Sequence, residues 1–170
     1  MHLISFSDRR ILRSLTCKVM LGTCWFFGLL LGMYAAANAG DSFLLTMRGD
    51  LETVSIPGLL ITLLPFLLTA FAVSLPHPGF LLPLVLSRAF VYSYSAYGLA
   101  IVFRGAAWLA RILLMFSRMA SVPLLMWLWL RKCDYADSFR MRELAVCGAA
   151  VVLIAVLDYC VVSPFAVALL

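Results

Sequence analysis

The sequence predicts an all-α fold, a polytopic bundle of about five helices that each cross a membrane. Hydrophobic residues make up 65% of the 170-residue chain and charged residues only 12%. A soluble domain averages about 45–50% apolar and about 25% charged residues, so this chain has more apolar surface than a soluble core can bury. Five apolar runs, separated by short polar or proline-rich segments, are each long enough to span a bilayer. Residues 17–170 are therefore expected to form one transmembrane domain.

The chain begins with a basic N-terminal segment, residues 1–16, and the first span is expected at about 17–37. Within this span Gly28 and Gly32 form a G-x-x-x-G pair, a flat strip that another helix of this chain or of a partner can approach closely. The A-x-A pattern at 37–39 is compatible with signal-peptidase cleavage. The apolar run is longer than a typical signal peptide's and further spans follow, so an uncleaved helix is favoured.

The second and third spans are expected to form an antiparallel hairpin. A polar link, 38–53, leads to the second span at about 54–75, and Pro65 inside it is expected to kink the helix. The segment LPHPG, 75–79, consists of helix breakers and predicts a tight turn. The third span follows at once, at about 80–103.

The fourth span is expected at about 105–130 and the fifth at about 144–162, with a polar loop, 131–143, between them. Five spans place residues 1–18 on the same side as this loop. Each of these two segments carries four Lys or Arg residues, whereas the 38–53 link carries one. The positive-inside rule therefore predicts a cytoplasmic N-terminal segment and a C-terminus outside.

Two tryptophans mark the expected inner end of the fourth span. Trp127 and Trp129 lie just before Arg131, and tryptophan at the membrane–water boundary is typical of spanning helices. We expect both rings to anchor the helix at the cytoplasmic interface.

The third span contains a polar stretch, SRAFVYSYSAYG, 87–98. A charge at mid-bilayer costs about 2.5–3.5 kcal/mol on insertion scales, so Arg88 is expected to face the bundle interior or water. Helical periodicity places Arg88, Tyr92 and Ser95 on one side, here called the polar face. Asp158, the carboxylate deep in the fifth span, is the expected charge partner. The set is either a structural pair that fixes helix order, which we favour, or a working polar groove.

A second basic feature consists of Arg104, Arg111 and Arg118, spaced by seven residues. On a helix they form one stripe about 21 Å long. The segment 104–118 can lie in the interface as an amphipathic helix, can span with its stripe packed inward, or can bind anionic headgroups or an anionic lipid-linked substrate. The interfacial interpretation leaves only about 12 residues, 119–130, to cross the bilayer, so a spanning helix is favoured.

Catalytic and metal-binding patterns are not found in the sequence. It contains no GxSxG, P-loop or GxGxxG motif, and no His, Cys and carboxylate set with metal-ligand spacing. The five cysteines show no CxxC spacing and are expected to be small, reduced, apolar residues: Cys17, Cys24, Cys133, Cys147 and Cys160. The sequence therefore predicts no enzyme and no cofactor. The net charge of +5 is expected to meet anionic lipid headgroups and not nucleic acid.

The order of these features resembles a known family. The segments WFFGLLLGMYAA, LLITLLPFLLTAFAVSL, LLPLVLSRAFVYSYSAYG and MASVPLLMW are similar to the stage II sporulation protein M family over about residues 15–165. The shared features are the G-x-x-x-G first span, the RAF opening before SYSAYG, and a fourth span that bears a proline. The family pattern is closer to K-G-F, with glycine where Ala89 stands here. The resemblance implies a non-enzymatic five-span protein of a bacterial plasma membrane. Close members of the family hold peptidoglycan-degrading partners at the septal membrane during spore formation.

Two functions fit these features. The first is a membrane scaffold that binds other membrane or envelope proteins through the Gly28/Gly32 strip and the polar face, in cell-envelope remodelling or sporulation. The alternative is a small transporter or permease subunit in which the polar face and Asp158 line a path. The small size and the lack of an internal repeat favour the scaffold.

Overall fold

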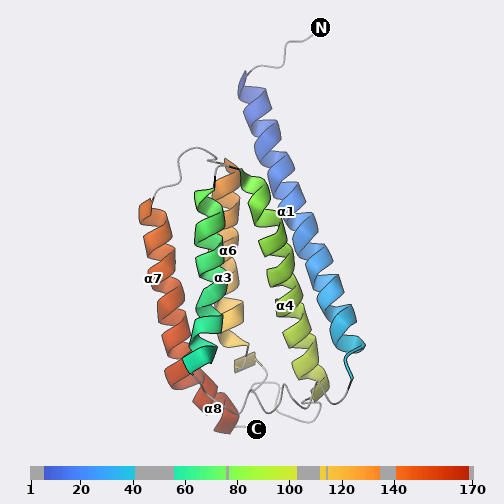
Figure 1. Ribbon diagram of the computed structural model, residues 1–170, viewed down its shortest axis with the longest axis vertical. Helices are drawn as coiled ribbons and strands as arrows, with labels where there is room; N and C mark the ends of the chain where they lie inside the picture. Colours follow the sequence, from blue (N-terminus) through green and yellow to red (C-terminus); the bar gives the residue numbers. More distant parts are fainter. Residues whose placement is uncertain are drawn as a thin grey trace.

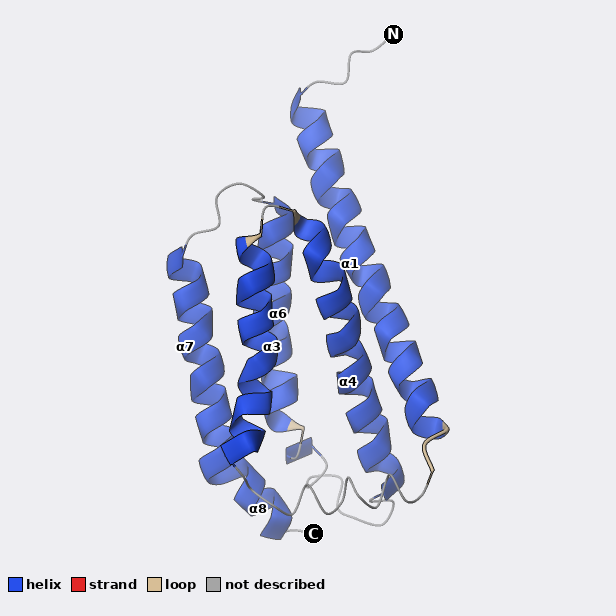
Figure 2. Cartoon of the chain, in the orientation of Figure 1, coloured by secondary structure: helices blue, strands red, loops and turns tan. Residues whose placement is uncertain are grey.

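The computed structural model describes residues 6–40, 56–75, 77–102, 112–113, 115–134 and 141–168, and every element among them is helical (Figure 2). The predicted all-α fold is therefore confirmed for this part of the chain. The long helices are α1 (Phe6–Ala37), α3 (Ile56–Ser74), α4 (Leu81–Val102), α6 (Phe116–Asp134) and α7 (Met141–Leu157). They run alternately up and down, so α1 begins at the end of the bundle opposite to the C-terminal helix α8 (Ser163–Ala168) (Figure 1).

The helices are not arranged in chain order. α1 packs along α4 at one edge of the bundle, α3 and α6 lie in the middle, and α7 packs on both of these at the other edge (Figure 1). The main buried cluster joins α1, α3, α4 and α6, through residues that include Leu21, Val73, Val85, Leu125 and Trp129. This cluster lies in the half of the bundle nearest the α3–α4 turn.

The hairpin of α3 and α4 is as predicted. A short 3-10 helix, η1 (Pro78–Phe80), follows the turn, and the backbone N–H of Gly79 donates to His77 Nδ1 at 3.0 Å. α3 continues through Pro65 as one helix. The Thr69 hydroxyl donates to the Pro65 carbonyl at 2.7 Å. Pro65 itself has no backbone N–H, so it cannot donate to the carbonyl four residues earlier, at Ile61.

The loop expected at 131–143 is shorter than predicted. α6 continues to Asp134 and α7 already begins at Met141, so the prediction is wrong for these flanks. Basic residues are favourable at a helix C-terminus and acidic residues at an N-terminus, and Arg131 and Glu143 occupy such positions. They also form an ion pair of 3.0 Å between the two helices. Charges that indicate a loop on a hydropathy scale here extend both helices.

The start of the fourth span also differs from the prediction. A turn at Met115, whose N–H donates to the Ile112 carbonyl at 3.1 Å, precedes α6. The described residues therefore do not show the uninterrupted helix expected at 105–130. Residues 116–118 of α6 belong to the 104–118 segment, and the last four residues of α6, 131–134, include three charged side chains. An interfacial 104–118 segment therefore still leaves only about 12 apolar residues, 119–130, to cross the bilayer.

The two tryptophans of α6 have different environments. Trp127 is 43% exposed, and the Arg131 guanidinium carbon lies 5.8 Å from its ring centroid. This environment fits the predicted role of an interfacial anchor. Trp129 is only 3% exposed and its ring packs 6.1 Å from that of Trp25 on α1. The predicted anchoring role is wrong for Trp129, because two residues along a helix turn the side chain to the opposite side.

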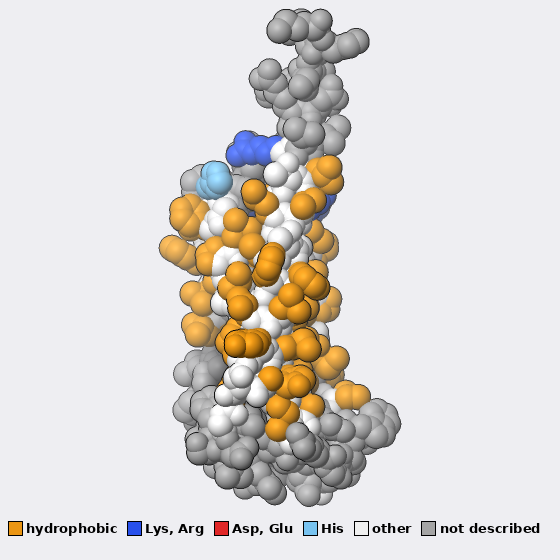
Figure 3. Space-filling view, turned by 90° about the vertical axis from the view of Figure 1, so that its right-hand side faces the viewer, with side chains coloured by type: hydrophobic (Ala, Val, Ile, Leu, Met, Phe, Trp, Pro, Cys, Tyr) orange, Lys and Arg blue, Asp and Glu red, His pale blue; other side chains and the backbone are white. Residues whose placement is uncertain are grey.

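The outer surface is predominantly apolar. Figure 3 shows hydrophobic side chains spread over the face that α1 forms, with Lys, Arg and His side chains near one end. Large apolar side chains are also exposed on α3 and α7, among them Phe71 and Leu153. Within the described ranges, two segments are long and apolar enough to cross a membrane, Arg13–Ala37 and Met141–Ala166.

Candidate functional site

The Gly28/Gly32 strip faces α4 of the same chain. A Cβ atom on Gly28 would lie 2.5 Å from the Leu86 carbonyl oxygen and 2.7 Å from Ala89 Cβ. A Cβ on Gly32 would overlap Ser93 Oγ and the Phe90 carbonyl oxygen. The two helices are thus close enough to exclude any side chain at these positions. Of the two uses expected for the strip, the structure places it in packing within the chain.

Ser93 completes this contact, and sequence reasoning missed it. Its hydroxyl donates to the Leu29 carbonyl of α1 at 2.7 Å. Ala89 and Ser93 are both buried and, like the glycines, stand four residues apart. This matching small-residue spacing is the signal that identifies α4 as the partner of α1.

The polar face of α4 lies in the bundle but meets two different helices. Arg88 Nη2 donates to Ser121 Oγ on α6 at 3.1 Å, and Ser121 and Ser95 are both buried. The Tyr92 ring instead packs against Trp25 of α1, with 6.4 Å between centroids. The polar face therefore joins α4 to its neighbours on both sides.

Asp158 lies at a different depth from Arg88. It opens a π-helical turn, η2 (Asp158–Val162), at the end of α7. Arg88 stands 88 − 81 = 7 residues from the start of α4 and Asp158 stands 158 − 141 = 17 from the start of α7. Both helices start at the same end of the bundle (Figure 1), so roughly 15 Å of helical rise separates the two residues. The geometry does not support the ion pair expected between them.

The arginine contact with Ser121 gives a testable prediction. Replacing Ser121 by alanine removes a buried acceptor from a charged donor, so we expect a loss of about 1.5–3 kcal/mol of folding stability. Ser87→Ala is the matched control, because Ser87 is exposed and its hydroxyl bonds the Leu84 carbonyl of its own helix at 3.0 Å. Denaturation of the detergent-solubilised variants measures both, and equal effects would contradict the prediction.

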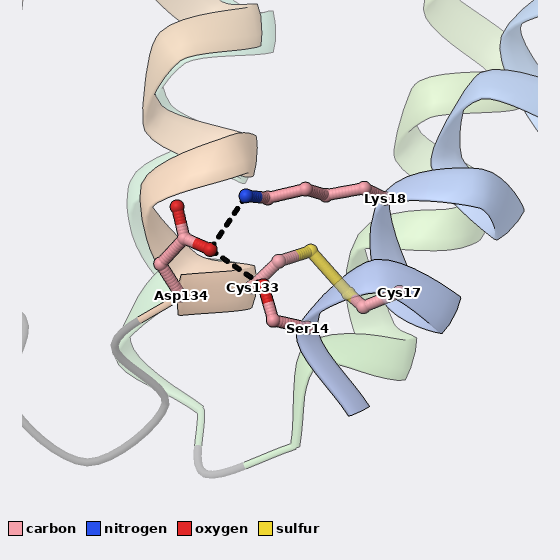
Figure 4. Close-up of polar contacts among 5 residues, drawn as sticks. All are labelled: Ser14, Cys17, Lys18, Cys133 and Asp134. Carbon is pink, nitrogen blue, oxygen red and sulfur yellow. Dashed lines mark hydrogen bonds and ion pairs between the residues drawn. A yellow bond between two sulfur atoms is a disulfide. The ribbon is translucent and has the colours of Figure 1, made fainter. Parts of the chain in front are cut away.

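A disulfide joins Cys17 of α1 to Cys133 of α6, with 5.8 Å between the Cα atoms (Figure 4). The expectation that all five cysteines are reduced is wrong for this pair, while Cys24, Cys147 and Cys160 are free. The two bonded residues are 116 apart in sequence, so no local spacing indicates the bond. Trp25 lies two turns after Cys17 on α1, and Trp129 lies one turn before Cys133 on α6. The two rings pack together, and this contact between the helices brings the cysteines close.

An ion pair and a hydrogen bond surround the disulfide. Asp134 Oδ1 accepts from Lys18 Nζ at 2.6 Å and from Ser14 Oγ at 2.5 Å (Figure 4). Ser14, Cys17 and Lys18 share one face of α1 because they are three and four residues apart. We call the five residues of Figure 4 the clasp: Ser14, Cys17, Lys18, Cys133 and Asp134.

The clasp carboxylate has a shifted pKa. The hydrogen bond from Lys18 and then that from Ser14 hold the pKa of Asp134 below its ordinary value of 3.8. A carboxyl whose pKa falls on folding stabilises the fold above its unfolded pKa, and this contribution disappears as the pH drops through the folded pKa. Because Lys18 and Asp134 are both more than a third exposed, we expect only about 0.2–1 kcal/mol from the pair.

Asp134→Asn tests this contribution. At neutral pH the variant should unfold at a slightly lower temperature than the unaltered protein, and the difference should shrink as the pH drops below the ordinary pKa of 3.8 and vanish below the lower pKa of the folded state. Comparing the two proteins at each pH cancels the titration of other carboxylates. A difference that persists unchanged into acid would show that Asp134 acts without its charge.

The remaining features carry little polar chemistry. A cavity of about 300 Å³ lies between α4 and the start of α6, with a mainly apolar lining: Tyr92, Ala96, Leu99, Ala100, Ile112, Met115 and Met119. Among the described residues, no group of three or more His, Cys, Asp or Glu side chains could hold a metal ion. Arg104, Arg111 and the side chain of Arg118 lie outside the described part of the chain, so the arginine stripe stays a prediction.

No protein-family model matches the chain, and neither the curated proteins nor the solved structures contain a match. The resemblance to the stage II sporulation protein M family therefore stays a prediction.

Proposed function

We propose that the chain is a multi-pass integral membrane protein. The observation that carries this proposal is the exposed apolar exterior, with side chains such as Phe26 and Phe27 on α1 and Phe71 on α3 more than half exposed. Small and polar residues lie inside, including Ser93, Ser95 and Ser121. In water such an exterior would be unfavourable by about 25 cal/mol for each Å² of apolar surface, whereas lipid accepts it.

The proposed orientation rests on the charges. One end of the bundle, here called the basic end, holds the first half of α1, the end of α6 and the start of α7. Its basic residues are Arg13, Lys18, Arg131, Lys132 and Arg142. By the positive-inside rule this end faces the cytoplasm. The five alternating helices then form five spans and place α8 at the outside.

We propose a non-enzymatic scaffold role in a bacterial plasma membrane, holding other envelope proteins. Because the Gly28/Gly32 strip packs inside the chain, partner binding falls to the outer faces of the edge helices, α1 and α7. The transporter alternative is less favoured, because Arg88 contacts Ser121 and Ser95 is buried, so these groups support packing. A role in sporulation or envelope remodelling rests on the family resemblance.

The membrane proposal is tested by extraction and by tags placed before Met1 and after Leu170. The protein should stay with membranes through an alkaline carbonate wash. A tag after Leu170 should be digested by protease added to intact spheroplasts, while a tag before Met1 should be digested only after lysis. Release by carbonate would refute membrane insertion, and the reverse digestion pattern would refute the orientation.

The scaffold proposal is tested by site-specific photocrosslinking. A photoreactive residue at Tyr34 on α1 or Leu153 on α7, both well exposed, should give the same protein adduct in repeated preparations. The adduct should be an envelope protein that co-purifies with the unaltered chain. The matched control is buried Leu125, which should give none. Adducts with lipid alone at both exposed positions would contradict the scaffold.

A further inference from the structure

The location of the disulfide is at odds with the charge distribution. Cys17 and Cys133 lie at the basic end, beside Lys18 and Lys132 in sequence. In the orientation proposed above, this end faces the cytoplasm. There, glutathione and thioredoxin-type thiols keep cysteines reduced, and the disulfides that do form are mostly transient, catalytic or redox-sensing. A permanent structural bond does not fit this position, but a reversible one does.

We propose that Cys17 and Cys133 form a reversible thiol–disulfide switch that locks α1 to α6 when the cytoplasm becomes oxidising. The co-reactants are of one chemical class, low-molecular-weight or protein thiols and their disulfides. This inference rests on the proposed orientation but not on the scaffold role.

The rest of the clasp keeps the two cysteines close in the reduced state. Asp134 holds Lys18 and Ser14 of α1 through contacts that do not involve sulfur. Below them the Trp25 and Trp129 rings remain packed. The Cα separation of 5.8 Å already lies in the range that a disulfide requires. The bond can therefore break and re-form while the helices keep their places.

The two sulfurs differ in access. Cys133 is 8% exposed, whereas Cys17 is only partly buried. An external thiolate therefore attacks Cys17 Sγ, the disulfide bond breaks, and Cys133 leaves as a thiolate that takes up a proton. A second thiol then attacks the mixed disulfide and releases Cys17.

The net exchange consumes two thiols and yields one external disulfide, with two electrons passing to the protein sulfurs. Oxidation is the reverse reaction, in which an external disulfide accepts the two electrons.

The switch acts on the edge helix. Without the bond, α1 is held mainly by its packing along α4, which Gly28 and Gly32 of α1 make close. With the bond, its cytoplasmic part is also fixed to α6. The redox state therefore sets how firmly the start of α1, which extends beyond the rest of the bundle (Figure 1), is attached.

The test follows the two thiols in intact cells. In the full chain, Cys24→Ser, Cys147→Ser and Cys160→Ser leave only the clasp cysteines, and rapid acid quenching with a mass-tagged maleimide counts free thiols. We expect two free thiols in untreated cells, none within minutes of adding diamide, and two again after its removal. Adding Cys17→Ser should leave one thiol under all three conditions. A bond that is complete in untreated cells, or one that diamide never forms, would overturn the switch.

A second measurement separates this result from the orientation. A membrane-impermeant maleimide, applied to reduced intact spheroplasts, should not label either cysteine until the cells are lysed. Labelling from outside would refute the orientation and the switch together. Protection from outside, combined with thiols that do not respond to diamide, would refute the switch alone.

Discussion

Gly32→Leu is expected to separate α1 from α4 and to destabilise the bundle by about 3 kcal/mol or more. Any Cβ at this position overlaps Ser93 Oγ and the carbonyl oxygen of Phe90. The serine side chain can rotate, but the carbonyl belongs to the backbone of α4 and cannot move without the helix. The leucine also prevents the hydrogen bond from Ser93 to Leu29. Unfolding of the detergent-solubilised protein measures the loss.

Gly22→Leu is the matched control on the same helix. No atom lies within 4 Å of a Cβ at Gly22, and leucine has a higher helix propensity than glycine by roughly 0.5–1 kcal/mol. We expect this variant to be as stable as the unaltered protein or slightly more stable. If the two leucine variants lose equal stability, the close contact between α1 and α4 is not what requires Gly32.

Removal of the disulfide is expected to have the second large effect. The bond closes a loop between residues 116 apart, and native disulfides contribute about 2–5 kcal/mol, largely by restricting the unfolded chain. Cys17→Ser should therefore unfold at a lower temperature than the oxidised protein. It should match the unaltered protein after treatment with a reductant, since both lack the same bond.

Cys24→Ser is the control for loss of a thiol on the same helix, because Cys24 is free and only partly buried. This variant should retain the difference between oxidised and reduced protein. If reduction leaves the unfolding temperature of the unaltered protein unchanged, the bond does not restrict the unfolded state in the detergent.

The hairpin and the glycine strip could be predicted because their signals are local. The breakers of LPHPG fix where α3 must end and α4 begin, and a G-x-x-x-G pair limits a helix face to close packing. The ends of α6 and α7 were harder to predict. Hydropathy treats Arg131 and Glu143 as loop formers, whereas helix-end electrostatics and their mutual ion pair make them helical.

The contacts between distant elements could not be predicted in the same way. Periodicity shows that Arg88 faces inward, but not that α6 lies beside it and offers Ser121. Helix order also decides which cysteines meet, so Cys17 and Cys133 carried no signal in the sequence. The choice of Asp158 had a different cause. Its apolar surroundings suggested a partner for Arg88. The third and fifth spans start at the same end of the bundle, and counting the helical rise from that end places Arg88 and Asp158 at different depths.

The bond between α1 and α6 can form only late in the synthesis of the chain. Cys133 leaves the ribosome 116 residues after Cys17, roughly 6–23 s later at common rates of translation. During that interval α1 can already settle along α4, which emerges earlier, because the glycine strip needs no sulfur chemistry. The first and fourth long helices can be fastened together only once α6 has been made. An oxidised Cys17–Cys133 pair therefore shows that α1 and α6 of the same chain have already packed together.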